Sequence, residues 1–189
     1  LPSAQFRGHK ADIYEGGHRV PFIAKWPKQI QAGSSIGETV SLVDFFATAA
    51  ELSGYEIGEN EGEDSYSLLP LFRQESRHGE FREGTVFHSV NGTFAIRKGD
   101  WKLILAPGSG GWSFPRPGDP AEADLPEVQL YDLATDPGET RNLQAEQTEK
   151  VQELTALLSK YIREGRSTPG TPQANDPYDG EWKQVWFMD

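Results

Sequence analysis

The amino-acid sequence predicts an α/β chain in which a small antiparallel four-stranded sheet is packed by a C-terminal helix. Four short segments carry the apolar and β-branched residues that are typical of strands: 86–90, 93–97, 101–105 and 128–133. Asn91-Gly92 joins the first two segments and is a strong hairpin signal, because both residues tolerate positive φ. An apolar stripe at helical spacing over about 146–163 must be buried, and the sheet is the nearest apolar surface.

The N-terminal part of the chain predicts one strand and one helix. Residues 1–19 are rich in glycine and charge, and we expect them to form a loop. The apolar run 20–27 has proline near both ends, which suits the boundaries of one short buried strand. Residues 41–52 predict a helix that ends at Gly54. Its apolar residues recur at helical spacing: Leu42, Phe45, Phe46, Ala49 and Leu52.

Three other segments are expected to be loops. The stretch 55–67 is dense in Glu and Asp and does not have the spacing of a calcium-binding loop, so we expect a solvated loop. Residues 106–127 are rich in glycine and proline and connect the third and fourth strands. The helix at 146–163 should end at Gly165. The tail from Arg166 is loop-like, and its aromatic residues indicate that it docks on the protein: Trp182, Trp186 and Phe187.

Composition argues against several functional classes. The chain has 189 residues, with 18 Lys and Arg against 29 Asp and Glu, which gives a net charge of −11. This balance argues against a nucleic-acid partner and against binding to an anionic membrane. Without cysteine, the chain has no disulfide, thiolate metal site or cysteine nucleophile. It begins at Leu1 without a signal-peptide pattern, so we expect it to start within a longer protein, of unknown localisation.

The densest cluster of candidate functional residues lies at 9–21. Lys10, Arg19 and two histidines flank Gly16-Gly17 directly before the predicted strand. Cations on a loop that is held by a rigid element suit an anionic oxyacid group. By composition alone, a polar loop with a chance cluster is an equally good interpretation. The histidines of the chain lie too far apart for a local zinc motif: His9, His18, His78 and His88.

Five motifs in order resemble those of the sulfatase family, over about residues 8–165. The first reads Lys-x-x-x-Tyr-Glu-Gly-Gly-x-Arg-Val-Pro from Lys10 to Pro21, with Trp-Pro following at 26–27. The second is a helix motif at 43–54, in which Ala47 stands where the family usually has proline. The other three are the Ser-Leu-x-Pro-Leu-like run, the late hairpin and the closing motif: 67–71, 95–104 and 130–143.

The resemblance implies the C-terminal part of a sulfatase with an alkaline-phosphatase-like fold. Residues 1–80 would be the end of the large α/β domain, 81–165 a small sheet-and-helix subdomain, and 166–189 a tail. The implied activity is hydrolysis of sulfate esters, with a small-molecule or glycan sulfate ester as the partner and a sulfated carbohydrate as the expected substrate. The family uses formylglycine and a divalent cation, usually calcium.

The resemblance also assigns roles to residues. Lys10 stands where the family has a lysine that binds the sulfate, and a fixed ammonium group suits an ester oxygen whose negative charge grows as the bond breaks. His18, directly after Gly-Gly, is a candidate for substrate contact, as are His9, beside the motif, and Arg19 within it. His88 is a further candidate, although packing on the sheet is the simpler interpretation.

The family's nucleophile and cation ligands have no counterpart in this chain. Ser113-x-Pro115-Arg116 is close to the Ser-x-Pro-x-Arg nucleophile motif, but its arginine is one place early and it follows the lysine motif. We therefore expect both groups upstream in the same protein, no metal site in the chain, and no activity of the chain alone. Two alternatives stay open: a phosphate or phosphonate monoester hydrolase of the same superfamily, and a non-catalytic binding module.

Overall fold

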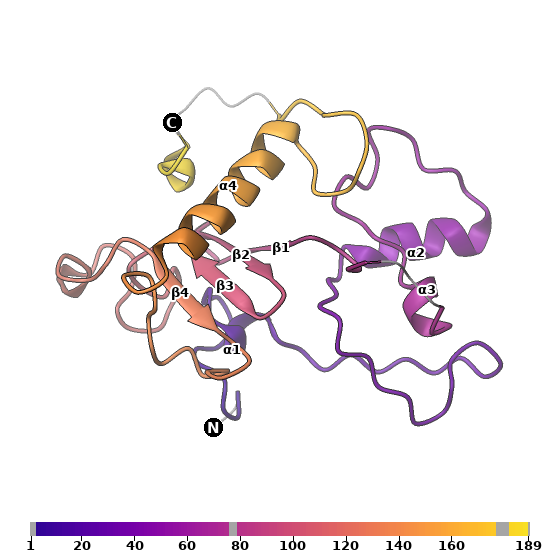
Figure 1. Cartoon of the computed structure of the whole chain (residues 1–189), viewed down its shortest axis with the longest axis horizontal. Coiled ribbons are helices and arrows are strands. Elements are labelled where there is room, and N and C mark those ends of the chain that lie inside the picture. The colour runs from indigo at the N-terminus through magenta and orange to yellow at the C-terminus, as the bar shows by residue number, and fades with distance from the viewer. Residues whose placement is uncertain (1–2, 76–78, 177–181, 189) are drawn as a thin grey trace. The chain divides into compact units, whose positions relative to one another are not determined.

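A computed structural model describes residues 3–75, 79–176 and 182–188 of the chain (Figure 1). The chain divides into two compact units. The first, here called the sheet unit, combines the residues up to Val20 with Val86–Lys160 and the segment from Asp176. The second unit comprises Pro21–Thr85 and Tyr161–Asn175. The domain boundaries after residues 80 and 165 stay a prediction about the longer protein.

The sheet unit is built on four strands in the order β1-β2-β3-β4, as the sequence predicts. Their bounds are β1 Thr85–His88, β2 Phe94–Lys98, β3 Trp101–Ile104 and β4 Gln129–Asp132. The β2–β3 and β3–β4 pairs are antiparallel, with Leu103 opposite Ile96 on one side and Leu130 on the other. All three side chains are fully buried, so a row of cross-strand contacts runs through the sheet.

Helix α4 (Thr148–Glu164) lies over this sheet (Figure 1). Its residues Leu154 and Leu158 are fully buried, and Glu153 Oε1 lies 3.2 Å from Lys98 Nζ of β2. The helix is followed by Gly165, whose φ of +61° is the left-handed conformation expected after a helix end. The predicted packing of a helix on the sheet is thus confirmed. Within the described ranges, no helix combines the length and the apolar character that a membrane crossing requires.

The turn between β1 and β2 lies at Asn91-Gly92, but its geometry differs from the expected hairpin. Gly92 has a φ of +83°, whereas Asn91 does not have a positive φ. The side chain of Asn91 instead accepts hydrogen bonds from the Thr93 N–H at 3.1 Å and from the Thr93 hydroxyl at 2.8 Å. Ser89 N–H donates to the Thr93 carbonyl at 3.1 Å, so the turn runs from Ser89 to Thr93 and is organised by the asparagine side chain.

Two predictions for the N-terminal part are wrong. The segment 20–27 is not a strand, and Val20, Phe22 and Ile23 are 63%, 45% and 90% exposed. A strand needs a neighbouring edge for its backbone hydrogen bonds, and the described part of the chain places no strand beside this segment. Within the expected loop 1–19, Glu15–His18 form the short helix α1.

Helix α2 (Asp44–Ser53) forms close to its predicted position, but its buried face consists of Asp44, Thr48 and two alanines rather than the large apolar residues. Asp44 and Thr48 are buried, and the Asp44 carboxylate accepts hydrogen bonds from the N–H groups of Ser41 at 2.7 Å and Tyr66 at 3.1 Å. Arg82 pairs with the same carboxylate. The large apolar residues of the segment are exposed instead: Leu42, Phe45, Phe46 and Leu52. This exposed apolar face is typical of a surface that another part of a protein covers.

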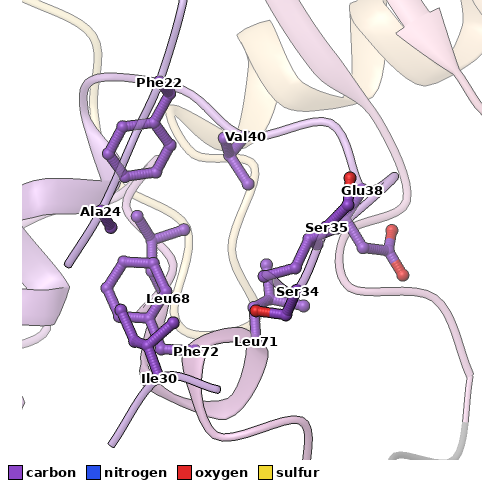
Figure 2. Close-up of a pocket in the computed structure, with 11 residues that line it drawn as sticks. Phe22, Ala24, Ile30, Ser34, Ser35, Glu38, Val40, Leu68, Leu71 and Phe72 are labelled. Carbon is purple, nitrogen blue, oxygen red and sulfur yellow. The ribbon is translucent and has the colours of Figure 1, made fainter. Parts of the chain in front are cut away.

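The second unit also holds an apolar pocket of about 260 Å³ beside the short helix α3 (Leu69–Phe72), which the sequence does not predict. Figure 2 shows Phe22, Leu68 and Phe72 on one side of it and Ser34, Ser35 and Glu38 on the other. Glu38 is the one titratable residue in its lining. The pocket therefore lacks the cations that an anionic ester would need.

The C-terminal segment docks on the sheet unit through aromatic contacts, as its composition indicates. The ring of Phe94 in β2 lies 5.8 Å from that of Trp182 and 6.2 Å from that of Phe187. Trp186 and Phe187 meet edge to face at 6.0 Å. Spacings of this kind are favourable for aromatic pairs, so the contacts hold the segment on the sheet.

Candidate functional site

The candidate site is the loop that leads from Gly8 into helix α1. Lys10 is exposed, and its ammonium group makes no hydrogen bond or ion pair with any residue that the structure describes. His9 is about half exposed, and its Nδ1 lies 3.2 Å from the hydroxyl oxygen of Ser113. The Lys10 ammonium is therefore available to an anion.

Asp12 fastens this loop to the long loop 106–127. Its buried carboxylate accepts hydrogen bonds from the N–H groups of Trp112 at 2.8 Å, Ser113 at 2.9 Å and His9 at 2.9 Å. Burial raises the pKa of Asp12, but the hydrogen bonds from Ser113, His9 and Trp112 outweigh burial and hold that pKa below its usual value. The ionised carboxylate thus fixes the backbone on both sides of Lys10.

Two backbone hydrogen bonds complete the frame around Lys10. The carbonyl of Ala11, the next residue, accepts a hydrogen bond from the N–H of Val90 at 3.0 Å. The N–H of Ile13 donates to the carbonyl of Ser109 at 2.9 Å. The turn after β1 and the long loop therefore both contact the Lys10 loop directly.

The Gly16-Gly17 pair of the motif is required by close packing. A Cβ atom on Gly16 would lie 2.3 Å from the carbonyl oxygen of Gly8, and one on Gly17 would lie 2.2 Å from that of Asp12. Neither contact is possible for a larger residue without movement of the backbone. The two glycines thus let helix α1 pack against the loop that it follows.

A buried ion network lies between helix α1 and the sheet. Lys102 Nζ of β3 lies 3.0 Å from Glu15 Oε1 and 2.9 Å from Glu139 Oε1, and all three residues are buried. Arg97 and Arg19 lie 3.5 Å and 3.9 Å from Glu15 Oε2. Glu15 is therefore paired with Lys102, Arg97 and Arg19, and its carboxylate does not occupy the Lys10 ammonium.

The two carboxyl groups of this network differ in their pKa. Burial raises the pKa of Glu15, but the charge and hydrogen bond of Lys102, together with Arg97 and Arg19, outweigh burial and lower it. Burial also raises the pKa of Glu139, and there the attraction of Lys102 does not offset it. The same ammonium group therefore lies between two carboxyl groups whose pKa values are shifted in opposite directions.

The tyrosine of the motif is anchored in the core. The Arg7 guanidinium lies over the Tyr14 ring, 3.9 Å from its centre, and donates a hydrogen bond to the Tyr131 hydroxyl at 3.1 Å. The Tyr14 and Tyr131 hydroxyls both donate to Gln129 Oε1, at 3.1 Å and 2.7 Å. Tyr14 and Glu15 thus connect the Lys10 loop to the sheet, and their side chains are engaged in the core rather than available to a substrate.

His18 points into the protein. Its ring centre lies 5.2 Å from that of Phe87, and its Nε2 is buried without a hydrogen-bond partner in the described part of the chain. Burial, together with the charge of Lys102, lowers the pKa of His18 to about 4. His18 is therefore neutral near pH 7.

This pKa makes the stability of the chain depend on pH. An unfolded histidine has a pKa of about 6.5, so between pH 6.5 and pH 4 the unfolded chain binds a proton that folded His18 does not. The contribution of His18 to the unfolding free energy is fully present above pH 6.5 and is lost as the pH falls toward 4. The loss is about 1–2 kcal/mol, because solvent reaches part of the ring and reduces the cost of charging it. His18→Phe should flatten this part of the pH profile of the unfolding free energy, measured with urea. The wild-type chain under the same conditions is the reference, and an unchanged slope in His18→Phe would contradict the assignment.

The structure brings only some of the predicted site residues together. Lys10 and His9 are neighbours on the exposed side of the loop. His18 lies inside, and Arg19 is held 3.9 Å from a carboxylate oxygen of helix α1. His88 is exposed in β1, with its ring 4.2 Å from a phenylalanine ring of β2. The substrate roles of all five residues stay predictions.

Sequence analysis missed the residues that hold the loop in place. Asp12 and Ser113 are 101 residues apart, and Lys102 lies between Glu15 and Glu139, which are 124 residues apart. No local spacing marks such pairs. The one available signal was a lysine in a strand whose neighbours are apolar, because a buried lysine requires carboxylate partners.

Within residues 3–75, 79–176 and 182–188, no group of three or more His, Asp or Glu side chains is placed to hold a metal ion. These residues therefore do not fit the calcium site that the family resemblance implies. The position of the calcium ligands and of formylglycine in the longer protein stays a prediction.

Comparisons with known proteins agree with the motifs. A family model described as N-sulphoglucosamine sulphohydrolase, C-terminal, matches residues 8–114, more than half of the chain. The chain is 34% identical over 160 residues to N-acetylgalactosamine-6-O-sulfatase of Bacteroides thetaiotaomicron, covering 83% of this chain and 30% of that protein. It is 30% identical over 202 residues to steryl-sulfatase of Mus musculus, covering 96% of this chain and 32% of that protein.

The fold is also shared with a solved sulfatase structure. A protein reported for the metabolism of multiple glycosaminoglycans by Bacteroides thetaiotaomicron superposes with a TM-score of 0.70 and 31% identity, over 85% of this chain and 32% of that one. The chain thus spans about a third of the length of these relatives. From the family match and the identities together, the chain belongs to the sulfatases, in the family of N-sulphoglucosamine sulphohydrolase C-terminal regions.

Proposed function

We propose that this chain is the C-terminal part of a longer enzyme that hydrolyses sulfate esters of carbohydrates, and that Lys10 binds the sulfate group. The observation that carries the proposal is the exposed Lys10 ammonium on a loop whose backbone is fixed by the buried Asp12. The family model described as N-sulphoglucosamine sulphohydrolase, C-terminal, matches residues 8–114, which contain this loop. The structure of the loop supports the motif assignment because it leaves Lys10 without a competing carboxylate.

Lys10 would act as a fixed positive charge beside the ester. Negative charge grows on the ester oxygen as the sulfur–oxygen bond breaks, and a cation that is already in position stabilises this charge without reorganisation. The hydrogen bonds to Asp12 and Ala11 supply that position by holding the backbone on either side of the lysine. His9, adjacent and half exposed, is the second candidate for contact with the same group.

The residues around Lys10 favour carbohydrate sulfates as substrates. A relative is named for N-acetylgalactosamine-6-O-sulfate, and a solved relative of 28% identity was determined in complex with D-glucosamine-2-N,6-O-disulfate. Around Lys10, His9 and Ser113 supply polar groups, and the Trp112 side chain is half exposed on the same anchored loop. A sugar ring presents both hydroxyls and an apolar face, which suits polar groups beside an indole. A sterol would require a mainly apolar wall.

The remainder of the longer protein is the other partner that we infer. The exposed apolar residues after Val20 and at the start of α2 would be covered by it: Phe22, Ile23, Phe45, Phe46 and Leu42, which precedes the helix. In the same proposal, the nucleophile and the cation ligands are supplied from there. We therefore expect the purified 189-residue chain to release no sulfate from an aryl sulfate above a buffer blank.

The intact protein tests the proposal with three esters of one aryl alcohol: sulfate, phosphate and phosphonate. We expect turnover of the sulfate ester to exceed that of the other two by at least about tenfold, and the chain alone to be inactive. Preferred turnover of the phosphate or phosphonate ester would establish the superfamily alternative instead. Binding of a sulfated sugar without any turnover would establish a non-catalytic module.

A further inference from the structure

We propose that a cavity walled by the C-terminal segment binds a second sugar ring of the substrate, next to the sulfated unit; this inference rests on the proposed carbohydrate specificity. The cavity has a volume of about 250 Å³ and belongs wholly to the sheet unit. Three segments form its walls: the β1–β2 turn, the loop 106–127 and the C-terminal segment. The lining residues that matter here are Asn91, Gly110, Glu122, Lys183, Gln184 and Trp186.

The C-terminal wall is attached to the hairpin. Gln184 Nε2 donates a hydrogen bond to the Asn91 carbonyl at 2.8 Å, which joins the segment to the β1–β2 turn. Trp182 and Phe187 on either side of it contact the ring of Phe94. The wall is thus part of the packed sheet unit, and the cavity between it and the loop is a formed feature of the surface.

The chemistry of the lining suits a sugar ring. Trp186 remains 49% exposed and offers an aromatic face against which the apolar side of a sugar can stack. Lys183 is exposed and offers hydrogen-bond donors, while the carboxylate of Glu122, which accepts from the Gly118 N–H at 2.7 Å, offers an acceptor. The negative charge of Glu122 would repel a second sulfate or a phosphate in this cavity. The charges of Glu122 and Lys183 make the cavity unsuitable for an apolar sterol.

Both of the other walls lead back to the Lys10 loop. Asn91 in the cavity follows Val90, whose N–H donates to the carbonyl of Ala11 at 3.0 Å. Gly110 in the cavity precedes Gly111, where a Cβ atom would lie 2.4 Å from the same carbonyl oxygen. The residue that contacts both walls is therefore the one next to Lys10. These backbone contacts place two walls of the cavity against the residue that follows Lys10, so in this proposal the ring next to the sulfated unit occupies the cavity.

The test compares two ligands of the intact protein: 6-O-sulfated N-acetylgalactosamine and a disaccharide that contains the same sulfated unit. Trp186→Ala should raise both the calorimetric Kd and the KM for the disaccharide about three- to tenfold, and leave those for the monosaccharide unchanged. Trp186→Phe should restore most of the loss. Leu125→Ala, a truncation of an exposed apolar residue of the same loop outside the cavity, is the control.

Lys183→Ala gives the same comparison if Trp186→Ala does not fold, with Lys160→Ala on the exposed side of α4 as its control. Equal effects on both ligands, or no effect on either, would overturn the second-ring site. If the intact protein binds the disaccharide through Trp186 but hydrolyses no sulfate ester, the proposed function fails and the site stands. If hydrolysis proceeds and neither variant changes disaccharide binding, the site alone fails.

Discussion

Replacing Lys10 by alanine in the intact protein is expected to lower kcat/KM for a sulfate ester by roughly 10²–10³-fold, or about 3–4 kcal/mol in transition-state stabilisation. The reason is that Lys10 would supply a charge that matters most when the ester bond breaks. Its side chain is exposed and unpaired in the described part of the chain, so its removal should change the unfolding free energy by less than about 1 kcal/mol. Steady-state kinetics and thermal unfolding of the same preparation measure both.

Two further variants make this result specific to the ammonium group. Lys10→Arg should recover little activity, because a planar guanidinium has a different shape and places its charge differently. Lys25→Ala removes another exposed lysine, outside the loop, and should leave the kinetics unchanged. Near-wild-type turnover by Lys10→Ala would remove the assignment of Lys10 to the sulfate.

Lys102→Met should cost about 3–5 kcal/mol of stability, the second large effect that we expect. It would leave the buried carboxyl groups of Glu15 and Glu139 facing each other without the ammonium that lies 3.0 Å and 2.9 Å from them. Breaking a buried ion pair by removing one partner is costly because the remaining charge stays desolvated. Urea unfolding at pH 7 measures the loss.

A double variant separates the broken network from the loss of packing. Lys102→Met combined with Glu139→Gln removes one of the two stranded carboxyl groups, so it should be more stable than the sum of the single changes predicts. Lys160→Met changes an exposed lysine and should have an effect of about 0.5 kcal/mol or less. Additive losses, or a Lys102→Met variant as stable as the wild type, would show that the network contributes no coupling.

The sheet and its covering helix were predictable because their signals are local. β-branched and aromatic runs marked all four strands, and the stripe that includes Leu154 and Leu158 marked α4. Asn91-Gly92 predicted the position of the hairpin correctly, but it did not predict the geometry of the turn. The asparagine side chain bonds to Thr93, and sequence alone did not show that this option would be used.

The rest depended on contacts between distant segments. The apolar run 20–27 has the composition of a strand, but a strand also needs a partner edge, and none is placed beside it in the described structure. Helix α2 was predicted from the apolar stripe that includes Phe45, whereas the residues that it buries are small or polar: Asp44, Ala47, Thr48 and Ala50. Within the candidate site, the sequence motif predicted Lys10. The role of Asp12 in anchoring the Lys10 loop became evident only from its hydrogen bonds to Trp112 and Ser113.

The central claim, that the Lys10 loop binds the sulfate, is tested most directly by a structure of the intact protein with 6-O-sulfated N-acetylgalactosamine bound. We expect Lys10 Nζ to lie within about 2.7–3.2 Å of a sulfate oxygen. The carboxylate of Asp12 should keep its hydrogen bonds to Trp112 and Ser113, at the 2.8 Å and 2.9 Å seen here. A sulfate bound elsewhere, with Lys10 pointing into solvent, would contradict the claim.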